Sequence, residues 1–505
     1  MRPKLGFYLV FLGVLLCGCT RQSSGAARSV ASARPEPAKL PARVGTHVPS
    51  TTGTERLTYT VHVDAALERL DVELCPEGFR IERLNAPSPG AQALLSGGRI
   101  VTPEGDVAFA NEANETDGVD LPATRPDECV RWGVQLPEKA ADPTSFRRVE
   151  GDRLLSPDLW LWVPTPRPEG VRIGVKLDLP EGVRGVLPWA FEAGTGTGTE
   201  ERVPETAFAW KSAGALTRGV GERVAVVGGE LQLSVLGPGF EHATEVREWV
   251  AQGARSASAL FGHFPLPRAG VILVPSERSG PAFGMALRGG GPLVTVFLDR
   301  HASAATLADD WTCAHEFLHL AVPRLPTEDS WLFEGLATYY TEVTRARAGV
   351  ISSEQAYQHL LDGFERGRRA GGTLTLRNES AQMRERHSFH RVYWAGAALA
   401  LLVDVASRRG GGKTLDDALR SFAGCCAASE EDWTAARVLA QLDTTLGAPL
   451  FTAQAQRWLD RSEFPALGQA LRALGVTSGK HGRAVFGRGP DAALRDAIMA
   501  PTALQ

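Results

Sequence analysis

The sequence predicts an α+β protein of several domains, with strands concentrated early in the chain and helices late. The chain has 505 residues, enough for roughly two to four domains that each bury a core. Apolar and polar residues alternate with a period of two in many segments before residue 188. Beyond residue 334, apolar residues recur mainly at helical spacing.

The composition is that of an ordinary soluble globular protein. Hydrophobic residues make up 43% of the chain and charged residues 22%. The formal net charge of −4 argues against a nucleic-acid partner held by a general electrostatic field.

The N-terminus carries the features of an export signal. Arg2 and Lys4 precede an apolar run over residues 5–16, which is too short to span a bilayer. The run ends in LCGC at residues 16–19, which resembles the lipobox of bacterial lipoproteins. The resemblance implies a signal peptide over residues 1–18 and a lipid on Cys19. An ordinary secretory signal is the alternative, and both imply export. With the lipid, we expect the protein in the bacterial cell envelope, facing the periplasm or the exterior.

A flexible tether and a β-sandwich are expected next. Residues 19–54 are rich in Ser, Ala, Pro, Arg and Thr and show no apolar periodicity, which predicts the tether. Residues 55–192 contain alternating strand patterns with turn clusters between them, at residues 57–63, 70–74 and 171–177.

The cysteines are interpreted in the light of export. Cys75 and Cys129 both fall in the β-sandwich, and in an oxidising compartment they are the expected disulfide. Two packed free thiols are the alternative. Cys313 is expected to be a packed thiol, and no pairing is assigned to Cys425 or Cys426, because a bridge between neighbours would be strained.

The second half is expected to hold a domain over residues 200–345, a helical part over 346–476 and a tail without a clear core over 477–505. The strands of the domain are predicted at residues 223–227, 231–235, 271–274 and 294–298, and a helix at 241–261. The helices of the helical part are predicted at residues 353–365, 393–407, 415–422, 433–442 and 451–459.

Residues 315–319 read HEFLH, an H-E-x-x-H motif. Leu307, Trp311, Leu318 and Val322 recur at helical spacing, so the motif is expected on a helix that ends near Val322. Residues four apart share a helix face, so His315 and His319 can bind one metal ion. Glu316 is placed to take a proton from water activated by that metal, and a carboxylate from a second helix would complete a zinc site. The alternative is a purely structural histidine pair.

Residues 331–340, WLFEGLATYY, resemble the third-ligand segment of gluzincin metallopeptidases. A helix is expected to begin at Glu334 and run to about Arg347, and Gly335 would permit a close helix approach. Further segments are similar to the glycyl aminopeptidase family, namely VYWAGA at 392–397, LLVD at 401–404 and TLDD at 414–417. The resemblance implies a thermolysin-like peptidase domain with Zn2+, a peptide or protein substrate, and Glu334 as third metal ligand.

The same resemblance implies that Tyr393 donates a hydrogen bond to the oxyanion formed when water attacks the peptide carbonyl. A tyrosine packed inside a helix bundle is the alternative. His387 and His390 are expected to be surface or loop histidines.

Three features depart from the family pattern. The connection from His319 to Glu334 is short, and the residues after Val476 are about thirty, too few for the PDZ domain that the family often carries. Residues 283–288 read FGMALR, with Ala286 where gluzincin aminopeptidases have a glutamate that holds the substrate's free amine. Arg288 is expected to be an exposed loop arginine, with a substrate carboxylate as its alternative partner.

The sequence therefore predicts an exported, lipid-anchored zinc metallopeptidase, and leaves open whether it removes terminal residues or cleaves within chains. Its contact with the membrane is expected through the lipid alone. A non-catalytic binding lipoprotein that keeps the fold is the alternative, and zinc-dependent hydrolysis of a non-peptide amide is a third possibility.

Overall fold

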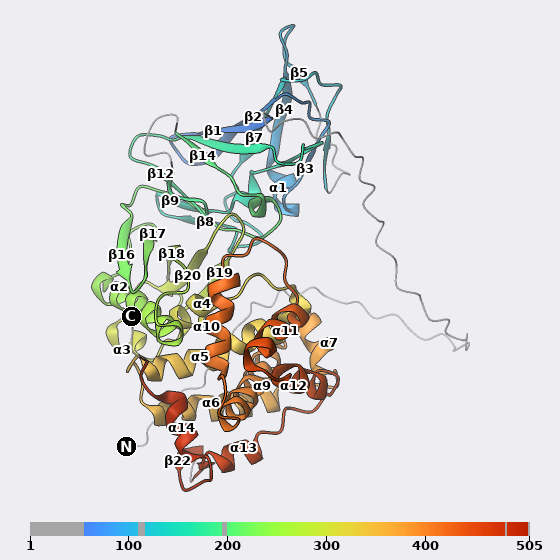
Figure 1. Ribbon diagram of the computed structural model, residues 1–505. Coiled ribbons are helices and arrows are strands. Elements are labelled where there is room, and N and C mark those ends of the chain that lie inside the picture. Colours follow the sequence, from blue (N-terminus) through green and yellow to red (C-terminus); the bar gives the residue numbers. More distant parts are fainter. Residues whose placement is uncertain (1–54, 110–116, 194–198, 480–481, 503–505) are drawn as a thin grey trace, which may run out of the picture. The chain divides into compact units, whose positions relative to one another are not determined.

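The computed structural model describes residues 55–109, 117–193, 199–479 and 482–502 (Figure 1). The expected signal peptide, the tether and Cys19 lie outside these residues. The described chain is a mixed α+β structure, with a sheet-rich N-terminal region and a helical C-terminal part.

The N-terminal region is built on a seven-stranded sheet. β1 pairs with β11 in parallel and with β2 antiparallel, and its alternate residues Leu57, Tyr59 and Val61 are buried. This alternation is the period-two pattern that predicted the strand. The strands, in spatial order, are β14 (Glu200–Arg202), β11 (Arg172–Asp178), β1 (Arg56–Val63), β2 (Arg69–Glu77), β7 (Cys129–Gln135), β4 (Leu95–Val101) and β5 (Val107–Ala108).

Two smaller sheets complete this region. Side chains of all three sheets share one apolar core, and the Tyr59 hydroxyl inside it donates to the Trp162 carbonyl at 2.7 Å. Cys75 on β2 and Cys129 on β7 form a disulfide. One sheet contains β10 (Val163–Thr165), β3 (Arg83–Asn85) and β6 (Gly118–Asp120); the other contains β13 (Ala190–Ala193), β12 (Arg184–Leu187), β15 (Ala215–Thr217), β9 (Asp152–Leu155) and β8 (Phe146–Val149); a short helix, α1 (Pro89–Leu94), precedes β4.

A separate five-stranded sheet packs against the helices that contain the predicted metal ligands. β17, β18 and β20 are parallel, and β19 is an antiparallel edge strand beside β20. Val271 and Leu273 of β18 share a core with the helices on one face, whereas Ile272 and Val274 pack against strands of the N-terminal region on the other. Both faces are covered, so β18 is almost continuously apolar. The order is β16 (Glu222–Val226), β17 (Gly229–Val235), β18 (Arg268–Ser276), β20 (Leu293–Asp299) and β19 (Phe283–Leu287).

Three helices accompany this sheet, one between β17 and β18 and two after β20. α2 (Ala243–Phe261) and α4 (Thr312–His319) pack against each other, and α3 (Ala304–Leu307) is a separate short helix before α4. The expectation of one helix running from Leu307 through Trp311 was wrong, because Trp311 is the residue that precedes the first turn of α4.

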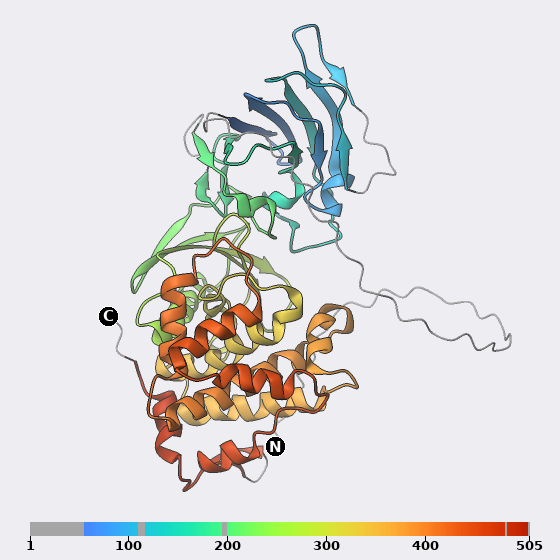
Figure 2. The same ribbon diagram turned by 45° about the vertical axis from the view of Figure 1, so that its right-hand side comes forward.

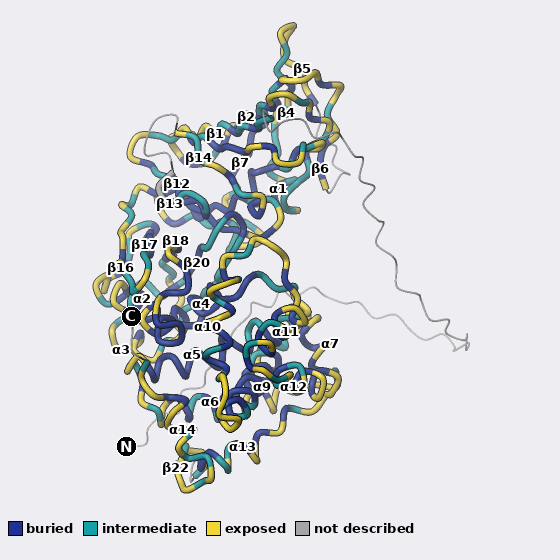
Figure 3. The backbone as a smooth tube through the Cα atoms, viewed as in Figure 1, coloured by how far each residue is buried: buried dark blue, intermediate teal, exposed yellow. Residues whose placement is uncertain are grey.

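The helical part is centred on two long helices, α5 (Ser330–Arg347) and α9 (Phe389–Arg409), which pack along each other. Figure 3 shows most of both as buried, and Figure 2 shows the surrounding yellow-to-red helices gathered about them. By length and composition α9 could cross a membrane, but it lies mostly buried as a core helix does. The other helices are α6 (Ser353–Arg369), α7 (Leu376–Ala381), α8 (Met383–Arg386), α10 (Leu415–Cys426), α11 (Ala435–Leu446), α12 (Leu450–Trp458) and α13 (Gly468–Ala473).

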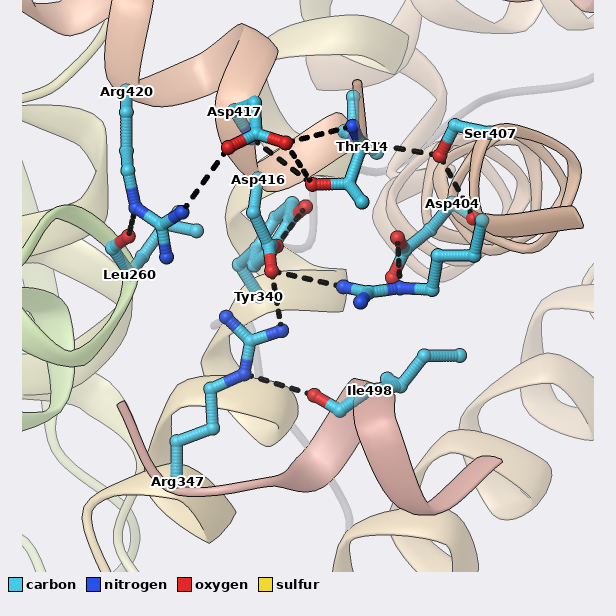
Figure 4. A network of polar contacts seen from close by, with 12 residues as sticks. Leu260, Tyr340, Arg347, Asp404, Ser407, Thr414, Asp416, Asp417, Arg420 and Ile498 are labelled. Atoms are coloured by element: carbon cyan, nitrogen blue, oxygen red, sulfur yellow. Dashed lines mark hydrogen bonds and ion pairs between the residues drawn. The ribbon is translucent and has the colours of Figure 1, made fainter. Parts of the chain in front are cut away.

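The C-terminal residues do contribute to the core, contrary to expectation. A hairpin of β21 (Val476–Ser478) and β22 (Ala484–Phe486) leads to α14 (Ala492–Met499), whose Ile498 and Met499 are buried. The Nε of Arg347, at the end of α5, donates to the Ile498 carbonyl at 2.8 Å (Figure 4). Residues on distant helices, among them Arg347 on α5 and Arg409 on α9, hold this segment, so its own sequence pattern gives little sign of packing.

Candidate metal centre and active site

Helix α4 presents two buried histidines on one face. His315 and His319 lie one turn apart, and their Nε2 atoms are 3.1 Å from each other. Both side chains point the same way because residues four apart in an α-helix stand above one another.

Helix α5 supplies a carboxylate to the same point. The Oε2 atom of Glu334 lies 3.3 Å from the Nε2 of His315 and 3.3 Å from the Nε2 of His319. α5 begins at Ser330, so Glu334 lies inside the helix and does not open it as the sequence suggested. Burial raises the pKa of Glu334, but the two histidines outweigh this effect and hold its pKa well below the ordinary value.

These three residues fit a zinc ion. One ligand atom from each lies within 4.8 Å of the others. Zinc binds imidazole nitrogen and carboxylate oxygen at about 2.0–2.2 Å, so ligand atoms around a tetrahedral ion lie roughly 3.3 Å apart. The separations of 3.1 and 3.3 Å between the three atoms therefore suit one shared cation.

Thr341 on α5 sets the tautomer of His315. Its hydroxyl donates to the Ala337 carbonyl at 2.7 Å, so toward the Nδ1 of His315, 3.3 Å away, it can only accept. The proton of the neutral ring is therefore on Nδ1, and the lone pair is on Nε2, which faces Glu334. Such an outer hydrogen bond is typical of histidines that bind metals. The sequence analysis did not find Thr341, although its spacing of seven from Glu334 places both on one face of α5.

Glu316 is buried beside this cluster and faces strand β19. The backbone N–H of Ala286 donates to its carboxylate. A Cβ on Gly284 would lie 2.5 Å from the Cγ of Glu316, so only glycine lets the strand approach this closely. Burial raises the pKa of Glu316 to about 7; Glu334 adds to the increase and His315 opposes it.

Tyr393 reaches the cluster from the second turn of α9. Its ring stacks on His315 with a centroid distance of 6.2 Å, and its hydroxyl donates to Glu334. Burial, with Glu334 and Glu316 adding to it, raises the pKa of Tyr393 well above the ordinary value, so the phenol keeps its proton. The structure therefore brings together all five residues that the sequence predicted for the metal and the reaction.

Arg288 is not the exposed loop residue that was expected. Its Nη2 donates to the carbonyls of Leu320 at 2.8 Å and Val322 at 2.9 Å, where the chain leaves α4. Burial lowers the pKa of this guanidinium to about 10. The expectation failed because Arg288 follows an edge strand whose alternate residues face α4. His387 and His390, expected at the surface, are exposed.

The remaining cysteines are not part of the group of His315, His319 and Glu334. Cys313 on α4 is free and buried, as expected. Cys425 and Cys426 form a disulfide with each other at the end of α10. The sequence analysis had assigned no pairing to them.

Part of the chain matches a known family. Residues 323–396 match the profile of the M61 glycyl aminopeptidases, and this segment contains both Glu334 and Tyr393. No curated protein matches the sequence.

Over most of the chain, the fold is similar to that of solved proteins of the aminopeptidase N family and of M1 zinc metallopeptidases. An aminopeptidase N family protein from Idiomarina loihiensis has a TM-score of 0.67 at 14% identity, over 83% of this chain and 78% of that chain. An M1 zinc metallopeptidase from Deinococcus radiodurans has a TM-score of 0.51 at 19% identity, over 82% and 94%. A variant from the same organism with a Tyr-Ser-Ala substrate has a TM-score of 0.51 at 18% identity, over 82% and 95%.

The predicted gluzincin resemblance and fold class are confirmed. The fold is the mixed α+β, multidomain fold of M1 aminopeptidases. The family match, the fold and the cluster of His315, His319 and Glu334 together support a zinc-dependent peptidase.

Proposed function

We propose that the chain is an exported, lipid-anchored metallopeptidase that hydrolyses peptide bonds with Glu316 as its general base. The observation that carries this proposal is the convergence of His315, His319 and Glu334 with Glu316 buried beside them. A buried carboxylate is costly unless it is used or well paired. The Glu316 carboxylate is buried and forms no ion pair with a described residue, which argues against a fold that has lost its activity.

The residues divide the chemistry among them. His315, His319 and Glu334 would hold the zinc ion. When bound, zinc supplies a Lewis acid that lowers the pKa of water and polarises a carbonyl. Glu316 accepts the proton of the attacking water and passes it to the departing amine. The hydrogen bond from Ala286 orients the carboxylate for both transfers.

Tyr393 is the proposed oxyanion donor. Its hydroxyl is protonated, and it already lies against Glu334 at the metal cluster. A substrate carbonyl at the cluster would compete for this hydrogen bond as negative charge develops on its oxygen. A preorganised donor of this kind stabilises the transition state more than the ground state.

Export and anchoring rest on the N-terminal sequence. The basic residues, the short apolar run and the lipobox-like LCGC support a lipid on Cys19. The disulfide between Cys75 and Cys129 suits an oxidising compartment. Fractionation of cells that express the wild type and Cys19→Ser tests this: the wild type should stay with membranes and the variant should not. A variant that remains with membranes would refute the anchor.

A cleavage profile tests the activity and the preferred end of the substrate. Ala286 offers no carboxylate for a free amine, so we propose that a free N-terminus is not required. Mixed peptides with free and acetylated N-termini should both be cut by the purified protein, with Glu316→Gln as the inactive control. Cleavage confined to free N-termini would show that another group holds the amine. No metal-dependent cleavage of any peptide would refute the peptidase.

A further inference from the structure

Trp311 is an exposed aromatic residue next to the metal cluster. The chain has 11 tryptophans, all in described segments, and Trp311 is the only one whose side chain is exposed, at 41%. An exposed indole beside the metal cluster is available to pack against a bound substrate.

The position of Trp311, directly before α4, directs it toward the reaction site. Residues 311, 315 and 319 are spaced four apart, so Trp311 continues the stripe of the two histidines by one turn. Its ring meets the ring of His315 edge-on, with centroids 5.1 Å apart. At the other end of the stripe Phe333 stacks on His319 with centroids 4.1 Å apart. An aromatic ring therefore flanks the cluster at each end, and the Trp311 end is open to solvent.

The backbone around Trp311 is held in place from both sides. The carboxylate of Asp310 accepts from the N–H of Ala282 at 3.0 Å and from the N–H of Thr312 at 2.8 Å. The Thr312 hydroxyl donates to the Ala282 carbonyl at 3.2 Å. These bonds tie the start of α4 to the chain that enters β19, the strand that contacts Glu316. The residues on either side of Trp311 are thus fixed to the chain that enters β19, and its ring contacts the metal ligand His315.

We propose that Trp311 is a specificity-determining residue that packs against the substrate side chain next to the scissile bond and selects large apolar side chains. The inference rests on the proposed peptidase function and deepens it. An indole ring with a fixed backbone gives much apolar contact for little loss of conformational freedom. The carboxylate of the preceding residue, Asp310, is committed to two N–H groups, so it does not add a partner for a cationic side chain.

Matched peptides test this selectivity. Two quenched-fluorescent series would carry Phe, Leu, Gly, Lys or Glu at the residue before or after the cleaved bond. We expect the wild type to prefer Phe and Leu in one series. Trp311→Ala should lower the Phe-to-Gly ratio of kcat/KM by roughly 10- to 100-fold, chiefly through KM. Trp311→Phe should restore most of the ratio. Val485→Ala, which removes an exposed apolar side chain on β22, is the control and should leave the ratio unchanged.

The outcome can contradict the inference in three ways. A preference for Lys, an equal loss on all five peptides, or an unchanged ratio would each overturn it. Metal content and circular dichroism of Trp311→Ala show whether the site and the fold are intact.

A binding measurement separates this inference from the proposed function. Calorimetry with Glu316→Gln, alone and combined with Trp311→Ala, measures affinity for the same peptides without turnover. Tighter binding of Phe than of Gly peptides that is lost with Trp311 supports the inference, even if the wild type cuts nothing and the peptidase proposal fails. Equal binding in both variants, or none in either, overturns it.

Discussion

Gly335 and Gly396 lie against each other where α5 crosses α9. A Cβ on Gly335 would be 2.5 Å from the Cα of Gly396, and a Cβ on Gly396 would overlap the Trp331 carbonyl. Glu334 is the neighbour of Gly335, and Tyr393 precedes Gly396 by about one turn of α9. One backbone contact therefore sets the distance between the third ligand and the proposed oxyanion donor.

Gly396→Ala should destabilise the protein and reduce its activity. The added methyl group has no space, and overpacking of this kind costs about 1–3 kcal/mol. A lower Tm and a lower kcat would be measured together by thermal unfolding and peptide hydrolysis. Gly424→Ala is the matched control, because nothing surrounds that helical glycine within 4 Å. It should be neutral or stabilise α10 by up to about 1 kcal/mol. Equal Tm values for the two variants would contradict the close crossing.

Glu316→Gln should abolish hydrolysis while metal binding persists. The amide cannot accept the proton of water, and loss of general-base catalysis lowers rates by about 10²- to 10⁴-fold. Turnover on a peptide substrate and zinc content by elemental analysis are the two measurements. Substantial turnover in this variant would rule out Glu316 as the base.

Removal of the metal should inactivate the enzyme reversibly. A chelator such as 1,10-phenanthroline should stop hydrolysis, and added Zn2+ should restore it. His319→Ala should bind far less zinc than the wild type, because it keeps only two of the three clustered ligands. Activity that persists in metal-free protein, checked by elemental analysis, would disprove a zinc peptidase.

Tyr393→Phe should lower kcat with little change in KM. Loss of an oxyanion donor costs about 10²- to 10³-fold in kcat. Tyr340→Phe gives a contrast, because the Tyr340 hydroxyl donates to buried Asp416 at 3.0 Å (Figure 4) and not to a residue of the metal cluster. That change should lower stability by about 1–3 kcal/mol and leave the kcat of the folded enzyme near wild type. If both variants lost kcat equally, the special role of Tyr393 would be excluded.

Reduction of the disulfide between Cys75 and Cys129 should destabilise the N-terminal region. The two residues are 54 apart in the chain, and a cross-link over a loop of this length typically contributes about 2–4 kcal/mol. Urea unfolding of wild type and of the Cys75→Ser, Cys129→Ser double variant would measure the difference. Identical unfolding midpoints and slopes would argue against a structural role.

Patterns of local periodicity predicted the elements that hold the metal cluster. The spacing of His315 and His319 is an intrinsic property of a helix, and the alternation over β1 is an intrinsic property of a strand. The strand pattern of β19 is not visible in the sequence, because Gly284 stands where an alternating strand would have a larger side chain. A larger residue there would collide with Glu316 on α4.

Roles that depend on tertiary contacts were also missed. Arg288 donates to backbone carbonyls at the end of α4. Every residue has such a carbonyl, so the residues around Arg288 in the sequence do not indicate this contact. Trp311 was expected to be an apolar residue within the zinc helix, whereas it precedes the first turn and is exposed. An apolar residue at helical spacing predicts a helix face but does not tell whether that face meets a core or solvent.

The bond between Arg347 and the Ile498 carbonyl has a practical consequence for handling the protein. It joins α14, the last helix among the described residues, to α5, the helix that carries Glu334. A purification tag fused shortly after Met499 would lie next to this buried contact and disturb it. Recombinant versions are therefore better tagged ahead of residue 55, where an added peptide precedes every described strand and helix.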